Sequence, residues 1–129
     1  MKDLVKKQGQ AEAFEIASAA TSTEEIGNPV YPPVQRLLTA RGIDCGDKRA
    51  RQVRADDYDR YDYIVCMDSN NLRNIRRIIS EDPKGKISRL MDWTGCPRDV
   101  ADPWYTGDFH TTERDVEEGC GALFAHLQP

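Results

Sequence analysis

The sequence predicts an α/β fold built on a parallel sheet. Short apolar runs suited to strands alternate with amphipathic segments suited to helices, and this order is typical of parallel strands joined by helical crossovers. The chain has 129 residues, of which 39% are hydrophobic, so it is expected to form one domain, residues 1–129, with a packed core. Only three strands are clear, which is few for an α/β sheet in a chain of this length.

The first part of the chain is expected to hold two helices and one strand. Residues 1–8 place their apolar side chains on one face, and Gly9 then supplies a helix stop. Phenylalanine, isoleucine and serine alternate over residues 13–20, which indicates a strand. Two prolines open the next helix, which runs to residue 41, and Gly42 closes it.

The rest of the chain is expected to hold two strands and two helices. Asp68 or Ser69 can cap the helix expected over residues 70–80, whose leucine and isoleucines share a face. The expected elements are, in order, a strand over residues 63–67, a helix over 70–80, a strand over 85–91 and a helix from Thr111.

Composition excludes several classes of protein. The net charge of −4 disfavours nucleic acid as the main partner, no apolar run is long enough to span a membrane, and the first residues do not form a signal peptide. The four cysteines have no close pairs, which is typical of reduced thiols in the cytoplasm. His110 and His126 lie near no cysteine pair, so no zinc site is expected.

The segment DVADPWYTGDFH, residues 99–110, carries the first chemical signal. It sets Asp102 beside Trp104 and Tyr105, and an acid next to aromatic walls suits proton donation to an aryl leaving group. Asp-Pro is also a common turn starter, and the two aromatics could be ordinary half-buried side chains. An acid alone rarely makes an enzyme, so a nucleophile is needed.

Cys45 and Arg51 have the Cys-x5-Arg spacing of cysteine phosphatases. Such a loop requires an apolar strand before the cysteine, small residues within it and a helix after the arginine. Charged residues occupy this loop and neither flank fits, so the match is interpreted as chance. Cys66 lies within an expected strand and is interpreted as a small buried hydrophobe.

Four motifs together resemble the low-molecular-weight protein tyrosine phosphatases, in the same order along the chain. They are IASAATS at 16–22, GNPVYPP to RGI at 27–43, ADDYDRYDYIVCMDSNNLRNI at 55–75 and DVADPWYTGDF at 99–109. The resemblance implies a three-layer α/β/α sandwich with a four-stranded parallel sheet. It also implies hydrolysis of phosphotyrosine through a phosphocysteine, without a metal or other cofactor.

The same resemblance assigns roles to four residues. The aspartate of the family's D-P-[WY]-Y motif, the general acid, corresponds to Asp102. Trp104 and Tyr105 would line one wall of the slot for the substrate ring. Glu24 falls on the facing wall, where the family often has an aromatic. The implied substrates are phosphotyrosine proteins or small aryl phosphates.

The family opens with an apolar strand and a V-C-x-G-N-x-C-R-S loop, and this sequence begins inside the helix that comes after them. We therefore expect an N-terminally truncated domain that keeps the acid loop, lacks the nucleophilic cysteine and phosphate-binding arginine, and is inactive as written. Because the first strand of the sheet would be missing, self-association or aggregation is expected. The alternatives are a catalytically dead phosphatase-like binding module and, less favoured, an arsenate reductase, for which Cys66 lacks a neighbouring pair of resolving cysteines.

Overall fold

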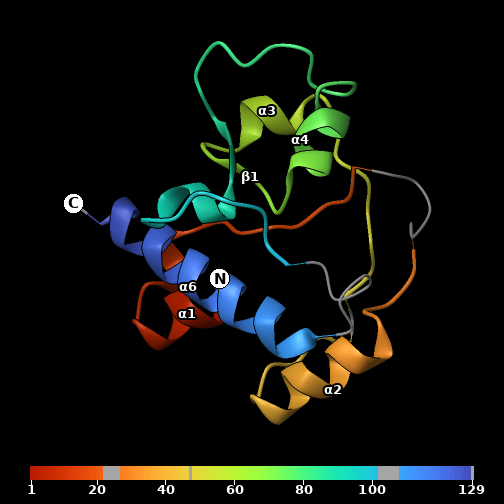
Figure 1. Ribbon diagram of the computed structural model, residues 1–129, viewed down its shortest axis with the longest axis vertical. Coiled ribbons are helices and arrows are strands. Elements are labelled where there is room, and N and C mark those ends of the chain that lie inside the picture. Colours follow the sequence, from red (N-terminus) through yellow and green to blue (C-terminus); the bar gives the residue numbers. More distant parts are fainter. Residues whose placement is uncertain (22–26, 47, 102–107, 129) are drawn as a thin grey trace. The chain divides into compact units, whose positions relative to one another are not determined.

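The computed structural model describes residues 1–21, 27–46, 48–101 and 108–128 (Figure 1). The chain divides into two compact units, Met1–Val53 and Arg54–Pro129. No helix among the described residues is long and apolar enough to cross a membrane.

The first unit contains the helices α1 (Lys2–Lys7) and α2 (Pro32–Ala40) and a 3₁₀ turn η1 (Ala11–Ala13). Both predicted helices are confirmed, and both are followed by a glycine with positive φ, Gly9 at 71° and Gly42 at 75°. Glycine adopts this conformation without steric cost, so it ends a helix where another residue would be strained.

The strand predicted over residues 13–20 forms only one parallel bridge, between Ala20 and Gln52. The Ala20 N–H donates to the carbonyl of Arg51 at 2.7 Å, and the Val53 N–H donates to the carbonyl of Ala20 at 2.8 Å. The alternation of side chains is present, but a strand also requires a continuous partner, and the described residues supply it only at Ala20.

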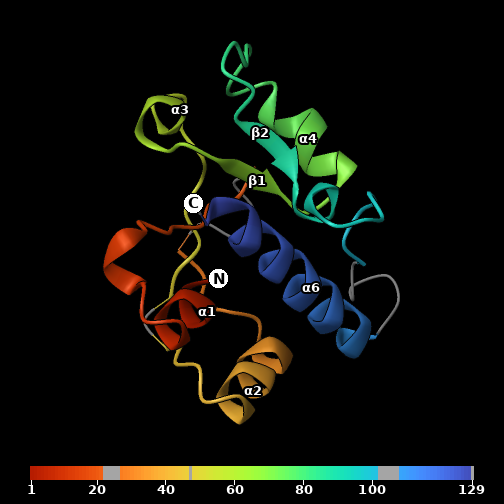
Figure 2. The same cartoon turned by 90° about the vertical axis from the view of Figure 1, so that its left-hand side faces the viewer.

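The second unit contains a two-stranded parallel sheet of β1 (Ile64–Cys66) and β2 (Ile87–Arg89), shown side by side in Figure 2. Both strands lie within their predicted ranges. The helix α4 (Ser69–Ile75) follows β1 and contacts both strands, and a short helix α3 (Asp57–Arg60) precedes β1. The α/β class with a parallel sheet is therefore confirmed, with two strands in the sheet that the structure describes.

The α4 helix begins as predicted, because the Asp68 carboxylate accepts a hydrogen bond from the Asn71 N–H at 2.8 Å. It ends earlier than predicted, at Ile75. Beyond that point the chain continues in turns, with the Ile78 N–H donating to the carbonyl of Ile75 at 3.0 Å. Ile75 and Ile79 are still buried, so the apolar pattern correctly marked core residues beyond the helix end.

The core of the second unit includes the contact between η2 (Leu90–Trp93) and the long helix α6 (Phe109–Leu127) (Figure 1). Leu90, Met91 and Leu123 are all buried. Gly119 allows a close approach, since a Cβ atom at that position would lie 2.5 Å from Cγ of Leu90. The last helix therefore needs a residue without a side chain where it crosses Leu90.

Candidate active site

The four predicted site residues, Asp102, Trp104, Tyr105 and Glu24, lie outside the described residues. The structure does describe the residues on both sides of the segment that carries Asp102. We call residues 98–101 the N-terminal stem of this segment, and residues 108–112 its C-terminal stem. Their contacts show what holds the acid-bearing segment at its two ends.

The N-terminal stem is bound to the end of β1 and the start of α4. The Val100 N–H donates to the carbonyl of Met67 at 2.9 Å. The N–H and the hydroxyl of Ser69 both donate to Oδ1 of Asp99, each at 2.9 Å. Although desolvation opposes the effect, the bonds from Ser69 and then Arg89 lower the pKa of the Asp99 carboxyl, so Asp99 is held as an anion.

Arg89, the last residue of β2, joins the same carboxylate. Its Nη1 lies 3.0 Å from Oδ1 of Asp99, while its Nε and Nη2 donate to Oδ1 of Asp92 at 3.1 and 2.9 Å. One guanidinium therefore ties the stem to the end of β2 and to η2. Lysine could not make this set of contacts, because its ammonium has no planar fork.

A second anchor comes from Asp115 in α6, which is 3% exposed. Arg98 donates to both oxygens of Asp115, at 2.8 and 2.7 Å, and the Ala101 N–H donates to Oδ2 at 3.0 Å. The hydrogen bonds from Arg98 lower the pKa of the Asp115 carboxyl. This buried carboxylate is therefore charged, and its charge is balanced by a bidentate arginine.

The C-terminal stem begins α6. The Asp108 carboxylate caps the helix by accepting hydrogen bonds from the N–H groups of His110 and Thr111, each at 3.1 Å, and from the Thr111 hydroxyl. The Thr112 hydroxyl lies 2.6 Å from the carbonyl oxygen of Ala101 and 3.5 Å from that of Asp108. Thr112 thus joins the C-terminal stem to the N-terminal stem.

Sequence reasoning missed these anchoring residues. The last helix was expected from Thr111 and begins two residues earlier, because Asp108 is its cap. Asp115 could have been noticed as an acidic residue on the buried stripe that also contains Gly119 and Leu123. Nothing in the sequence indicated that its partners would be Arg98 and Ala101.

In the part of the chain that the structure describes, neither Cys66 nor Cys45 has the surroundings of a phosphate-binding cysteine. Cys66 is buried in β1, and burial, followed by the charge of Asp68, raises the pKa of its thiol to about 11. Near Cys45, the Gly46 N–H donates to the Asp44 carboxylate at 3.0 Å, and the chain after Arg51 forms a bridge at Gln52 and no helix before Asp57. The Cys45 motif is thus unlike a phosphate loop both in its hydrogen bonding and in the conformation of the chain after it.

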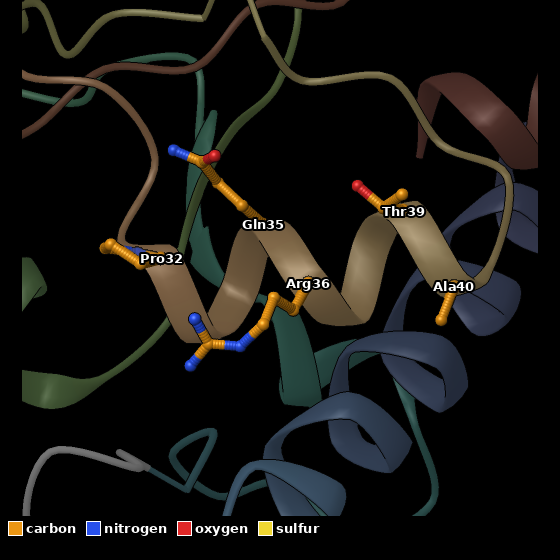
Figure 3. A pocket seen from close by; sticks show the side chains of 5 residues that line it. All are labelled: Pro32, Gln35, Arg36, Thr39 and Ala40. Carbon is orange, nitrogen blue, oxygen red and sulfur yellow. The ribbon is translucent and has the colours of Figure 1, made fainter.

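Each unit has a surface hollow. A hollow of about 460 Å³ is lined only by one helix, α2, through Pro32, Gln35, Arg36, Thr39 and Ala40, and Figure 3 shows Gln35 and Arg36 projecting from different sides of that helix. A second, of about 370 Å³, is lined by the N-terminal stem and by α6, including Arg98, Arg114 and Glu118. The second hollow is lined by residues of both stems and of α6, whereas the first is an open helix face.

Known proteins resemble the chain over almost its whole length. The profile of the family described as low molecular weight phosphotyrosine protein phosphatase matches residues 1–129. The low molecular weight protein-tyrosine-phosphatase YfkJ of Bacillus subtilis is 34% identical in an alignment 129 positions long that covers 98% of this chain and 83% of the relative. The low molecular weight phosphotyrosine protein phosphatase of Gallus gallus is 37% identical in an alignment 125 positions long that covers 93% of this chain and 78% of the relative.

The chain also resembles solved structures of phosphatases. The crystal structure of YfkJ from Bacillus subtilis matches with a TM-score of 0.92, covering 98% of this chain and 81% of that chain at 34% identity. The low molecular weight protein tyrosine phosphatase from Streptococcus pyogenes matches with a TM-score of 0.84 and the same coverage at 31% identity. The chain therefore belongs to the low molecular weight phosphotyrosine protein phosphatase family.

Proposed function

We propose that this chain carries the acid-bearing part of a phosphotyrosine phosphatase site, with Asp102 as general acid. Membership of the family over residues 1–129 is the observation that carries the proposal. The anchoring of both stems around Asp102 supports it, because general acid catalysis requires a proton donor held in place. The substrates would be phosphotyrosine proteins or small aryl phosphates.

In this proposal Asp102 gives its proton to the phenolate oxygen as the P–O bond breaks. The conjugate acid of this leaving group has a pKa of about 10, so the phenolate leaves poorly without a proton. The phosphoryl group passes to a cysteine thiolate. Asp102, now a carboxylate, then takes a proton from the water that attacks the phosphocysteine, which releases phosphate and restores the acid.

Trp104 and Tyr105 would form one wall of the slot that receives the phosphotyrosine ring, and Glu24 would stand on the facing wall. Stacking on aromatic side chains suits a phenyl ring. A carboxylate at residue 24 would add negative charge to that wall of the slot. We therefore propose that acidic residues next to the phosphotyrosine are disfavoured, because like charges repel.

The nucleophile is the part that these 129 residues do not contain, since no V-C-x-G-N-x-C-R-S motif occurs among them. Cys66 cannot replace it, because a buried thiol with a raised pKa is protonated near neutral pH. We propose that residues 1–129 alone do not turn over aryl phosphates. We also propose that the full sheet of the active form has four parallel strands. The four cysteines of residues 1–129 are free thiols, which fits a cytoplasmic compartment.

The test measures hydrolysis of p-nitrophenyl phosphate and a phosphotyrosine peptide by two proteins. One is the 129-residue chain, which we expect to be inactive. The other is the same chain extended before Met1 by a strand and nucleophile loop of the family pattern, which we expect to be active. In the extended chain, Asp102→Asn should lower kcat on the phosphotyrosine peptide by about 10²–10⁴-fold.

Two results would contradict the proposal. Full activity of the Asp102→Asn variant would show that another group supplies the proton. Enzyme-level turnover by the 129-residue chain would show that a nucleophile exists within it. If the extended chain is inactive but binds phosphotyrosine peptides, the alternative of a catalytically dead binding module replaces the phosphatase.

A further inference from the structure

We infer that Asp115 and Thr112 are positioning residues for the proposed general acid, acting through Ala101. This inference rests on the proposed role of Asp102. Asp115 binds the N–H of Ala101, and Thr112 binds its carbonyl oxygen. Both backbone polar groups of the residue directly before Asp102 are therefore held by side chains of α6.

The two side chains act from one face of the helix. Thr112 and Asp115 are three residues apart, a spacing that brings side chains together on a helix surface. Oδ2 of Asp115 lies 3.0 Å from the nitrogen of Ala101, and Oγ1 of Thr112 lies 2.6 Å from its oxygen. The Ala101 carbonyl belongs to the planar peptide bond that leads into Asp102, so holding this oxygen restricts the orientation of that peptide plane.

The burial of Asp115 shows that this arrangement is costly to build. Taking a carboxylate out of water costs several kcal/mol, and a well-packed apolar residue at such a position is often as stable or more stable. Arg98 supplies two hydrogen bonds that offset this cost, at 2.8 and 2.7 Å. The remaining bond goes to the backbone of Ala101, which points to a role in fixing the stem.

Other charged groups near Asp115 do not take part in the clamp formed by Asp115 and Thr112. The charge of Arg114 has a minor effect on the pKa of Asp115, and Glu118 lines the adjoining hollow. Glu118 is exposed, so its replacement should leave the stem intact. It provides a control on the same helix, one turn beyond Asp115 and similar in charge.

The test measures how the rate depends on the leaving group, which a purely structural role of Asp115 and Thr112 would not change. In the extended chain, kcat/KM, which reports the steps up to formation of the phosphocysteine, is compared for two substrates. The leaving group of phenyl phosphate needs a proton, and that of 2,4-dinitrophenyl phosphate does not. We expect Asp115→Asn and Thr112→Val to lower kcat/KM for phenyl phosphate by about 10–100-fold, because small displacements of a catalytic group are costly. Their kcat/KM values for 2,4-dinitrophenyl phosphate should stay near that of the unmodified protein.

Matched variants make the result decisive. Thr112→Ser keeps the hydroxyl and should restore activity on phenyl phosphate, and Glu118→Gln should match the unmodified protein on both substrates. In the 129-residue chain, hydrogen exchange at the Ala101 amide should speed up in Asp115→Asn and not in Glu118→Gln. If Asp115→Asn fails to fold, the comparison of Thr112→Val with Thr112→Ser still tests the positioning role.

Failure of this inference can be told apart from failure of the proposed function. If Asp102→Asn loses activity selectively on phenyl phosphate while Thr112→Val loses it equally on both substrates or not at all, the positioning role is wrong and the acid role stands. If the loss of activity in Asp102→Asn does not depend on the leaving group, the proposed function is wrong, and the positioning role is then wrong as well.

Discussion

Cys66 shows how the surroundings of one side chain decide its chemistry. It ends β1, is 6% exposed, and has neighbours that disfavour a thiolate. Burial is the larger cause and the negative charge of Asp68 the smaller one, and together they raise the pKa of the thiol from its ordinary 9.0 to about 11. Cys96, by contrast, is exposed.

We predict that iodoacetamide alkylates Cys66 much more slowly than Cys96 in the folded chain. The thiolate is the reactive form, and a rise of two pKa units leaves about 100-fold less of it at about pH 8. Burial slows the reagent further. Peptide mass spectrometry after timed quenching would measure both rates, and unfolding in urea should make them similar. Equal rates in the folded chain would show that Cys66 is accessible.

Single residues were predictable from the sequence where their partners are close in the chain. The Asp68 cap could be inferred from a polar residue placed at the start of an apolar helix pattern, and its acceptor bond is to Asn71, three residues on. Asp115 binds Ala101 across 14 residues, and no local rule signals such a pairing. The roles of Asp102, Trp104, Tyr105 and Glu24 come from the family resemblance and stay predictions.

Helix α6 depends on one glycine and tolerates another. Gly119 is buried, and an added Cβ would lie 2.5 Å from Cγ and 2.9 Å from Cδ2 of Leu90. A Cβ atom added at Gly121 would have none of the surrounding atoms within 4 Å. Both glycines lie inside the helix, where glycine costs conformational entropy relative to alanine.

We predict opposite effects of the two alanine substitutions. Gly119→Ala should destabilise the chain by about 1–2 kcal/mol, because the cost of overpacking against the buried Leu90 exceeds the gain in helix propensity. Gly121→Ala should stabilise it by about 0.5–1 kcal/mol, because only that gain applies. Urea unfolding followed by circular dichroism would measure both. Stabilisation by Gly119→Ala would mean that α6 and η2 are farther apart than described.

The elements were predictable where periodicity and end signals agree. The helices α1, α2 and α4 all have a start or stop residue that the sequence displays, and β1 and β2 are short apolar runs. The segment over residues 13–20 has strand periodicity, but periodicity does not supply the partner strand that a sheet needs. Helix ends were less predictable, as at Ile75, since an apolar stripe continues through the turns after α4.

At the level of the whole chain, the pairing of the strands bears on self-association. In the part of the second unit that the structure describes, β1 pairs only with β2. An unpaired strand edge presents N–H and C=O groups that can bind another chain. The parallel pairing was predictable from the alternation of elements, whereas the number of strands was not, because strand count depends on which segments find partners.

We predict that the 129-residue chain self-associates. Its apparent mass, measured by size-exclusion chromatography with light scattering, should rise with concentration, and its thermal transition should be broad. Adding the strand and nucleophile loop before Met1 should give a monomer with a sharper transition, because the added strand would pair within the sheet. A monomeric, sharply melting 129-residue chain would contradict the prediction.

The surroundings of Trp93 have a practical consequence for spectroscopy. Its ring lies 4.5 Å from that of His126 and 5.9 Å from that of Tyr63, and its Nε1 donates to the Ser88 hydroxyl at 3.1 Å. The chain has only two tryptophans, Trp93 and Trp104. The fluorescence of Trp93 therefore reports on η2 and the end of α6, and Trp93→Phe would leave Trp104 as the single emitter for following substrate binding.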